Sequence, residues 1–353
     1  AFCKQLTKSI KQVFDFLSLR WNCLHSSEAV QGTDTVDEKK LVIECLMNWI
    51  DFTNIPGLEV ARQDLLISVL DTAMLDQELI EAVGELIACI YHKYGCHISE
   101  LNALIYPRVL RLREVWNTIL QDPQVEHDSS LLETCETITK IFVEIAEGSE
   151  SFIFSSKAVQ IGQMEIVLQL LECCRFKYDL NTSLLPVRFF GNSLCLELGE
   201  ANERKMDAAE IGDRNGVDAE DFVLNTYNPI LGTVLEIGLE QMCVDESLFV
   251  LREEGESHND DRDLVLSEDD VEKRKEWVLF CKDASEALYS DKVLQRLGML
   301  LQEKIGEIQS SEDASSVQWA PIESILFALQ AILPDVRDRQ NEVIHWLLET
   351  VLS

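Results

Sequence analysis

The sequence is poor in the residues that interrupt helices and in positive charge. Seven prolines and fifteen glycines are spread over 353 residues, which favours a helical chain with short connections. Lysine and arginine number 30 against 63 acidic residues, and the formal charge of −33 argues strongly against binding to a nucleic-acid backbone. Basic protein surfaces are the partners that this charge favours; the alternative is that the acidity only keeps an elongated chain soluble.

Sequence signatures of enzymes are missing as well. The chain has no glycine-rich phosphate loop, no Gly-x-Ser-x-Gly turn and no carboxylate pair that stands out from the acidic background. Cys89, His92 and Cys96 have a spacing that places them on one helix, with His97 beside them, and could offer ligands to zinc. We favour the simpler interpretation, a repeat helix that ends in small and amphipathic residues. We therefore expect no catalytic residue, cofactor or metal, and interpret the chain as a binding protein.

Long apolar runs and a disulfide framework are also lacking. No apolar run approaches the length that crosses a bilayer. The eleven cysteines are odd in number and dispersed, and residues such as Cys45, Cys135 and Cys195 fall on apolar helical faces. This pattern predicts free thiols in a reducing compartment, the cytosol or the nucleus. Because the chain begins at Ala1 within a helix and ends on another apolar helix, we expect it to be a piece of a longer protein.

What the sequence has in abundance is amphipathic helix, most clearly between Trp319 and Leu333. Pro321 can open a helix, because its missing N–H would be unpaired there anyway. The apolar residues recur at spacings of three and four, which places them on one face: Ile322, Ile325, Leu326, Leu329, Ile332 and Leu333. Pro334 ends this helix, and another amphipathic segment follows. Two helices of this kind need similar neighbours to bury their apolar stripes.

The rest of the chain supplies such neighbours. We predict thirteen helical segments and no strand, grouped in pairs that begin near residues 1, 59, 98, 160, 220, 291 and 336. Pro107 is expected to kink or interrupt its helix, and a helix from about Asp221 to Leu251 to break near Pro229. The predicted fold is an all-α solenoid of HEAT-like (or armadillo-like) antiparallel helix pairs, with about six repeats plus a terminal helix in a single array over residues 1–353. A compact all-helical domain is the alternative.

Two polar inserts interrupt the predicted helix pairs. Residues 199–218, with three glycines, are expected to form a polar inter-helix loop, and residues 253–272 an acidic inter-helix loop. The second insert is too acidic to pack against a core, and we predict that it binds basic groups of a partner. A solvated loop without a partner is the alternative. Its carboxylates are Glu253, Glu254, Glu256, Asp260, Asp261, Asp263, Glu268, Asp269, Asp270 and Glu272.

Three stretches, in order along the chain, resemble the central arch of the β-karyopherins. The first is Cys45-Leu46-x-x-Trp49-Ile50, and the second is Leu198-Gly199-Glu200, which closes a helix in the family; here Leu194 and Cys195 replace a Trp-Tyr pair. The third consists of Trp319, Glu323, Leu326, Phe327, Ala331 and Ile332. The branch that the chain resembles most is that of transportin-SR (transportin-3) and importin-13.

The resemblance implies a nuclear transport receptor built from HEAT repeats, of which this chain would be the central part. Such importins carry cargo proteins through nuclear pores, contact Phe-Gly repeats of nucleoporins and respond to the GTP form of Ran, so the protein would shuttle between nucleus and cytoplasm. Ran would bind mainly through repeats outside this chain. No direct contact with nucleic acid and no membrane insertion are expected. The competing interpretation is a static HEAT-repeat scaffold subunit of a phosphatase or a chromosome-associated complex.

Overall fold

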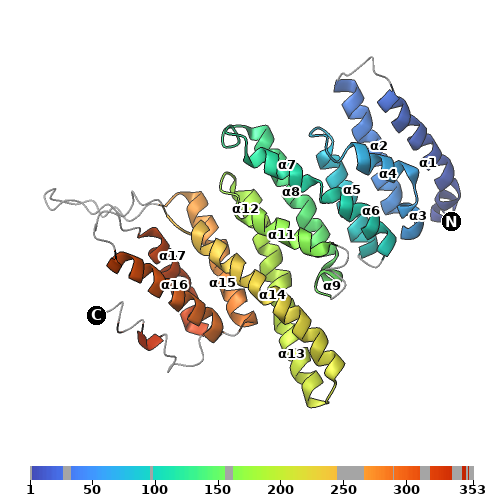
Figure 1. The fold of residues 1–353 in the computed structure, drawn as a ribbon. Helices are drawn as coiled ribbons and strands as arrows, with labels where there is room; N and C mark the ends of the chain where they lie inside the picture. The colour runs from blue at the N-terminus through green and yellow to red at the C-terminus, as the bar shows by residue number, and fades with distance from the viewer. Residues whose placement is uncertain are drawn as a thin grey trace. The chain divides into compact units, whose positions relative to one another are not determined.

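The computed structural model describes most of the chain as helix. The described residues are 2–26, 33–95, 98–155, 162–244, 266–288, 290–310, 319–335, 344–346 and 349. Within these ranges there is no strand, which confirms the predicted all-α class. The chain divides into two compact units, Ala1–Pro186 and Val187–Ser353, and each is described by itself (Figure 1). The prediction of one array over the whole chain concerns how the units join, and stays a prediction.

The first unit consists of two rows of helices. One row contains α2, α5, α8 and α11, each of which packs against the one before it, and the other contains α1, α3, α4, α6 and α7. Contacts of α1 with α2 and of α7 with α8 join the rows. Successive helices stacked in two layers are the arrangement of an α-solenoid. The helices are α1 (Phe2–Ser26), α2 (Thr33–Phe52), α3 (Gly57–Ala61), α4 (Asp64–Thr72), α5 (Ile80–Tyr94), α6 (Ser99–Val109), α7 (Leu112–Leu120), α8 (Ser129–Gly148), α9 (Glu150–Ile153), α11 (Gln163–Cys174) and α12 (Leu180–Phe189), whose last residues belong to the second unit.

In the second unit, the last residues of α12 are followed by a π-helical turn, η2 (Phe190–Cys195), that runs directly into the next helix. Its helices are α13 (Leu196–Glu210), α14 (Arg214–Gln241), α15 (Glu268–Ala287), α16 (Ser290–Ser310) and α17 (Ala320–Ile332), followed by the 3₁₀ turn η5 (Leu333–Asp335). The helix α15 packs against η2, α14, α16 and α17. α13 and α14 form an antiparallel hairpin, and its far end extends beyond α15 and α16 in Figure 1.

Three prolines test the expected helix boundaries. Pro321 lies in the first turn of α17, as predicted. Pro107 lies near the end of α6, and the chain leaves the helix at Leu110 before α7 begins, so the predicted interruption is confirmed. The predicted break at Pro229 is wrong, because α14 continues from Arg214 to Gln241. Tyr227 and Ile230 beside this proline are buried, and their packing outweighs the lost backbone hydrogen bond.

The polar loop expected at residues 199–218 is also wrong, because these residues are helical except for a short turn. Alanine, glutamate, lysine, arginine and methionine, all good helix formers, fill α13. Gly212, at φ 73°, supplies the left-handed residue of the turn, and the N–H of Asp213 donates to the carbonyl of Ala208 at 2.8 Å. Gly199 lies inside α13, so Leu198-Gly199-Glu200 does not close a helix as the resemblance implied.

The prediction of an acidic loop at residues 253–272 is wrong for the carboxyl-terminal end of this segment. Residues 253–265 lie outside the described part of the chain, whereas 268–272 belong to α15 and not to a loop. Ser267 is the N-cap, and its hydroxyl accepts a hydrogen bond from the N–H of Asp270 at 3.1 Å. Acidic residues suit this position because the positive end of the helix dipole favours them. Of the terminal helix expected from residue 336 onward, only 344–346 and 349 are described, as helix.

Candidate functional site

The predicted partner-binding carboxylates fall into two groups. Glu253, Glu254, Glu256, Asp260, Asp261 and Asp263 lie outside the described residues. Glu268, Asp269, Asp270 and Glu272 lie in the first turns of α15. Asp270 accepts a hydrogen bond from the hydroxyl of Ser267 at 2.6 Å, so part of this group stabilises the start of the helix. A role of these ten residues in binding a partner stays a prediction.

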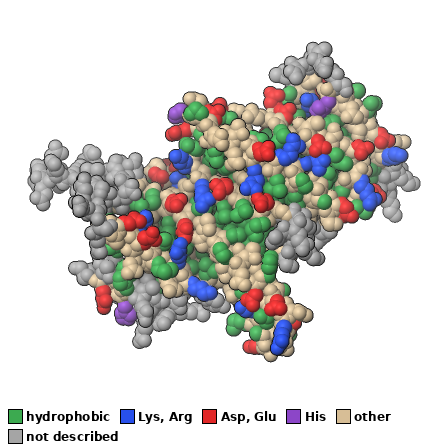
Figure 2. All heavy atoms as spheres, viewed as in Figure 1, with side chains coloured by type: hydrophobic (Ala, Val, Ile, Leu, Met, Phe, Trp, Pro, Cys, Tyr) green, Lys and Arg blue, Asp and Glu red, His purple; other side chains and the backbone are tan. Residues whose placement is uncertain are grey.

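The α13–α14 hairpin is an acidic surface that the sequence analysis missed. Between residues 196 and 221 its carboxylates are Glu197, Glu200, Glu203, Asp207, Glu210, Asp213, Asp218, Glu220 and Asp221, against the cations Arg204, Lys205 and Arg214. Arg204 pairs with Glu197, Glu200 and Glu220, and Lys205 pairs with Asp221. Figure 2 shows red and blue side chains together on the hairpin, at the bottom of the view. The sequence of α13 contains many good helix formers but no apolar stripe, and these helix formers were the signal that could have indicated a helix.

Two apolar side chains lie exposed near the tip of this hairpin. Met206 is 61% exposed and Ile211 is 81% exposed. α13, which is described along its whole length, buries only Leu198 and Ala201. α13 therefore contributes little to the core of its unit, whereas α14 buries ten residues between Val223 and Leu239.

A groove lies at the root of the hairpin, between η2, α13 and α15. It has a volume of about 540 Å³ and is lined by Gly191, Asn192, Cys195, Leu196, Gly199, Glu200, Glu203, Asp283, Glu286 and Ala287. A Cβ at Gly191 would lie 3.0 Å from Oδ2 of Asp283, so the glycine leaves room for this carboxylate. Near Gly199 a Cβ would meet no atom within 4 Å, so the groove is open there. The volume is in the range of ligand-binding clefts.

The carboxylates in and beside this groove are perturbed by burial. Partial burial, and secondarily the negative charge of Glu286, raises the pKa of Asp283 above its ordinary value. Burial also raises the pKa of Glu197, although the hydrogen bond and charge of Arg204 oppose that effect. Among the described residues, no cation pairs with Asp283, Glu286 or Glu203, whereas Glu200 lies 3.1 Å from Arg204. The groove therefore has negative charge that the described part of the chain does not neutralise.

The residues of the third resembling stretch hold α17 against α15. Nη2 of Arg274 lies 2.6 and 2.7 Å from the two carboxylate oxygens of Glu323, and its Cζ lies 4.0 Å from the centroid of the Phe327 ring. The Arg274 side chain is buried. Glu323 and Phe327 thus have a structural role, since a buried arginine requires such partners.

A second groove of the same unit lies beside α17, with a volume of about 310 Å³. Leu239, Cys243, Leu300, Pro321 and Ile325 form its apolar part. Glu236, Glu240, Glu303 and Lys304 line it as well, together with Ser324. Glu236 pairs with Arg296 and Lys304 with Glu307, whereas Glu240 and Glu303 form no ion pair among the described residues.

In the first unit, Cys89 and His92 line a groove of about 370 Å³ with Met47, Asn48, Asp51, Ala88 and Glu144. Cys96 and His97 lie outside the described residues. The described part of the chain contains no group of three or more histidine, cysteine or acidic side chains that could hold a metal ion. Burial and the charge of Asp51 raise the pKa of the Cys89 thiol. A raised pKa keeps this thiol protonated, and the expectation of no zinc at Cys89, His92 and Cys96 stays a prediction.

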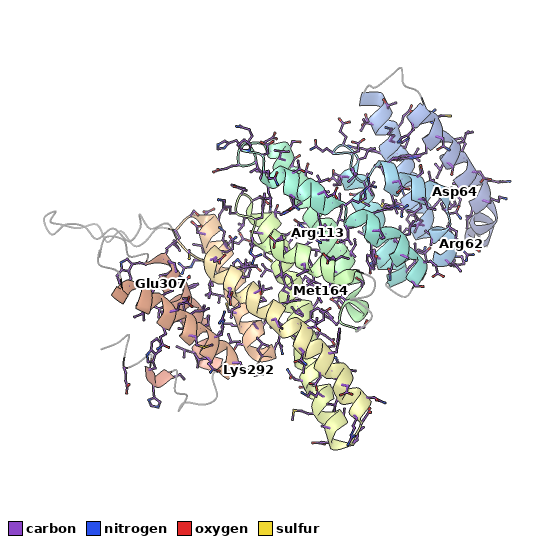
Figure 3. The ribbon with its side chains drawn as sticks, in the orientation of Figure 1. Arg62, Asp64, Arg113, Met164, Lys292 and Glu307 are labelled. Carbon is purple, nitrogen blue, oxygen red and sulfur yellow. The ribbon has the colours of Figure 1, made fainter. Side chains whose placement is uncertain are left out.

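Two sets of charged contacts in the first unit join different helices. Lys93, near the end of α5, donates hydrogen bonds to the carbonyls of Ile50, Asp51 and Thr53 at the end of α2. Arg113 of α7 pairs with Glu165, beside Met164 at the start of α11 (Figure 3). These contacts cap a helix end and connect successive helices, which are structural roles.

The described cysteines are free thiols, and several of them are deeply buried: Cys135, Cys173, Cys174, Cys195 and Cys281. Burial raises the pKa of Cys135, Cys173 and Cys281 to about 12. These thiols are therefore neutral and belong to the core.

Comparison with known proteins assigns no function to these grooves or to the hairpin. No helix in the described ranges combines the length and apolar character needed to span a bilayer. The chain matches no protein-family model and no curated protein sequence.

Proposed function

We propose that this chain is the central part of a nuclear transport receptor of the β-karyopherin superfamily, close to the transportin-SR and importin-13 branch. The observation that carries the proposal is the two-row packing of successive helices in a chain with a formal charge of −33. A stack of this kind offers a large acidic surface to basic partner proteins. We propose the β-karyopherin superfamily in particular because the three resembling stretches occur in the same order along this chain as in that family.

The proposed activity is binding, and its control is linkage between ligands. Cargo and Ran in its GTP form compete for overlapping surface or favour different curvatures of the helix stack, so each lowers the affinity of the other by the same factor. Neighbouring helices can shift by small amounts at every interface, and these shifts add up along a stack. No residue of the chain acts as a catalyst in this proposal.

The proposed partners are cargo proteins with basic surfaces, nucleoporin Phe-Gly repeats and Ran, the last mainly through repeats outside this chain. The protein would move between nucleus and cytoplasm, without binding nucleic acid directly and without inserting into a membrane. The acidic carboxylates of residues 253–272 would contribute a secondary contact with Ran or cargo.

The test is a binding measurement with Ran loaded with GTP or GDP. It uses this chain and, in parallel, the same chain extended to the amino terminus of its full-length protein. We expect the extended form to bind Ran-GTP at least about tenfold more tightly than Ran-GDP, a coupling of ordinary size for an allosteric protein. Equal affinity of the extended form for both nucleotide states would overturn the proposal.

Such a result would favour a static HEAT-repeat scaffold of a phosphatase or a chromosome-associated complex. The contact of α15 with α17 through Arg274 and Glu323 suits a scaffold too, because it fixes two helices of the stack. A scaffold predicts partners whose binding is independent of nucleotide and no interaction with Phe-Gly repeats.

A further inference from the structure

We draw no further inference here: the strongest candidate, the patch of exposed apolar side chains that α1 and α2 present with Phe16, Leu19, Leu41 and Phe52, lies on helix faces for which nothing in the structure shows what covers them.

Discussion

Two helices of equal length, α5 and α13, show how differently this chain uses the same secondary structure. Each has 15 residues. α5 buries eight of them, in contact with α2 and α8, whereas α13 buries only two and packs mainly against α14. Burial of apolar surface is the main source of stability, so α5 holds its unit together. The polar surface of α13, by contrast, is available to partners.

The largest expected difference in stability between variants of α5 and variants of α13 concerns apolar side chains. Leu86 in α5 is fully buried, and Leu86→Ala should lower the free energy of unfolding by about 2–5 kcal/mol, because the lost contacts leave a cavity. Met206→Ala in α13 should change it by less than about 0.5 kcal/mol, since that side chain lies in solvent. Urea unfolding followed by circular dichroism measures both values. Similar losses in the two variants would mean that α13 is part of a core.

Charged side chains should give a smaller difference. Lys93 of α5 caps three carbonyls at the end of α2, one of them at 2.7 Å, and Lys93→Met should cost about 1–3 kcal/mol because these acceptors lose a charged donor. Arg204 of α13 has three acidic partners but is half exposed. Arg204→Met should therefore cost less than about 1 kcal/mol. The same unfolding measurement applies, and a larger loss for Arg204→Met would contradict this interpretation.

Glycine substitutions should have effects of opposite sign in the two helices. In α5 a Cβ at Gly84 would approach Ile141 Cγ1 to 2.9 Å, so Gly84→Leu should destabilise the protein by about 1–3 kcal/mol through overpacking. In α13 the space beside Gly199 is open, and Gly199→Ala should stabilise the helix by up to about 1 kcal/mol. Thermal melting curves give the sign directly. Destabilisation by Gly199→Ala would show that the groove does not tolerate even a methyl group.

The contrast between the two helices also explains what could be predicted from sequence. Val83, Leu86, Ile87 and Ile90 of α5 recur in the sequence at spacings of three and four, which is the period that a buried helical face imposes. α13 has no such stripe, and Gly199 and Gly212 indicated a loop. Helix propensity and the pairing with α14 decide its conformation instead.

The groove could not be found from the sequence, for a similar reason. Asp283 and Glu286 lie at least 80 positions from Glu200 and Glu203 in the chain, and each is one of 63 acidic residues. Only the packing of α15 against η2 and α13 brings these carboxylates together. The predicted acidic stretch near residue 260 can be seen in the sequence because its members lie close together along the chain, whereas the carboxylates of the groove do not.

The smallest expected effect is a pH dependence at this groove. The pKa of Asp283 is raised in the folded protein by burial and by Glu286, so the folded state binds this proton more tightly than the unfolded state does. The resulting stabilisation is full below the ordinary aspartate pKa and is lost as the pH rises through the folded-state value. Asp283→Asn should therefore stabilise the protein at pH 7 and lose that advantage in acid, whereas the exposed control Asp207→Asn should have little effect at any pH. Melting temperatures of both variants and the parent across the acidic range provide the measurement. An advantage of Asp283→Asn that persists at the lowest pH would mean that side-chain packing, and not the charge of the groove, determines it.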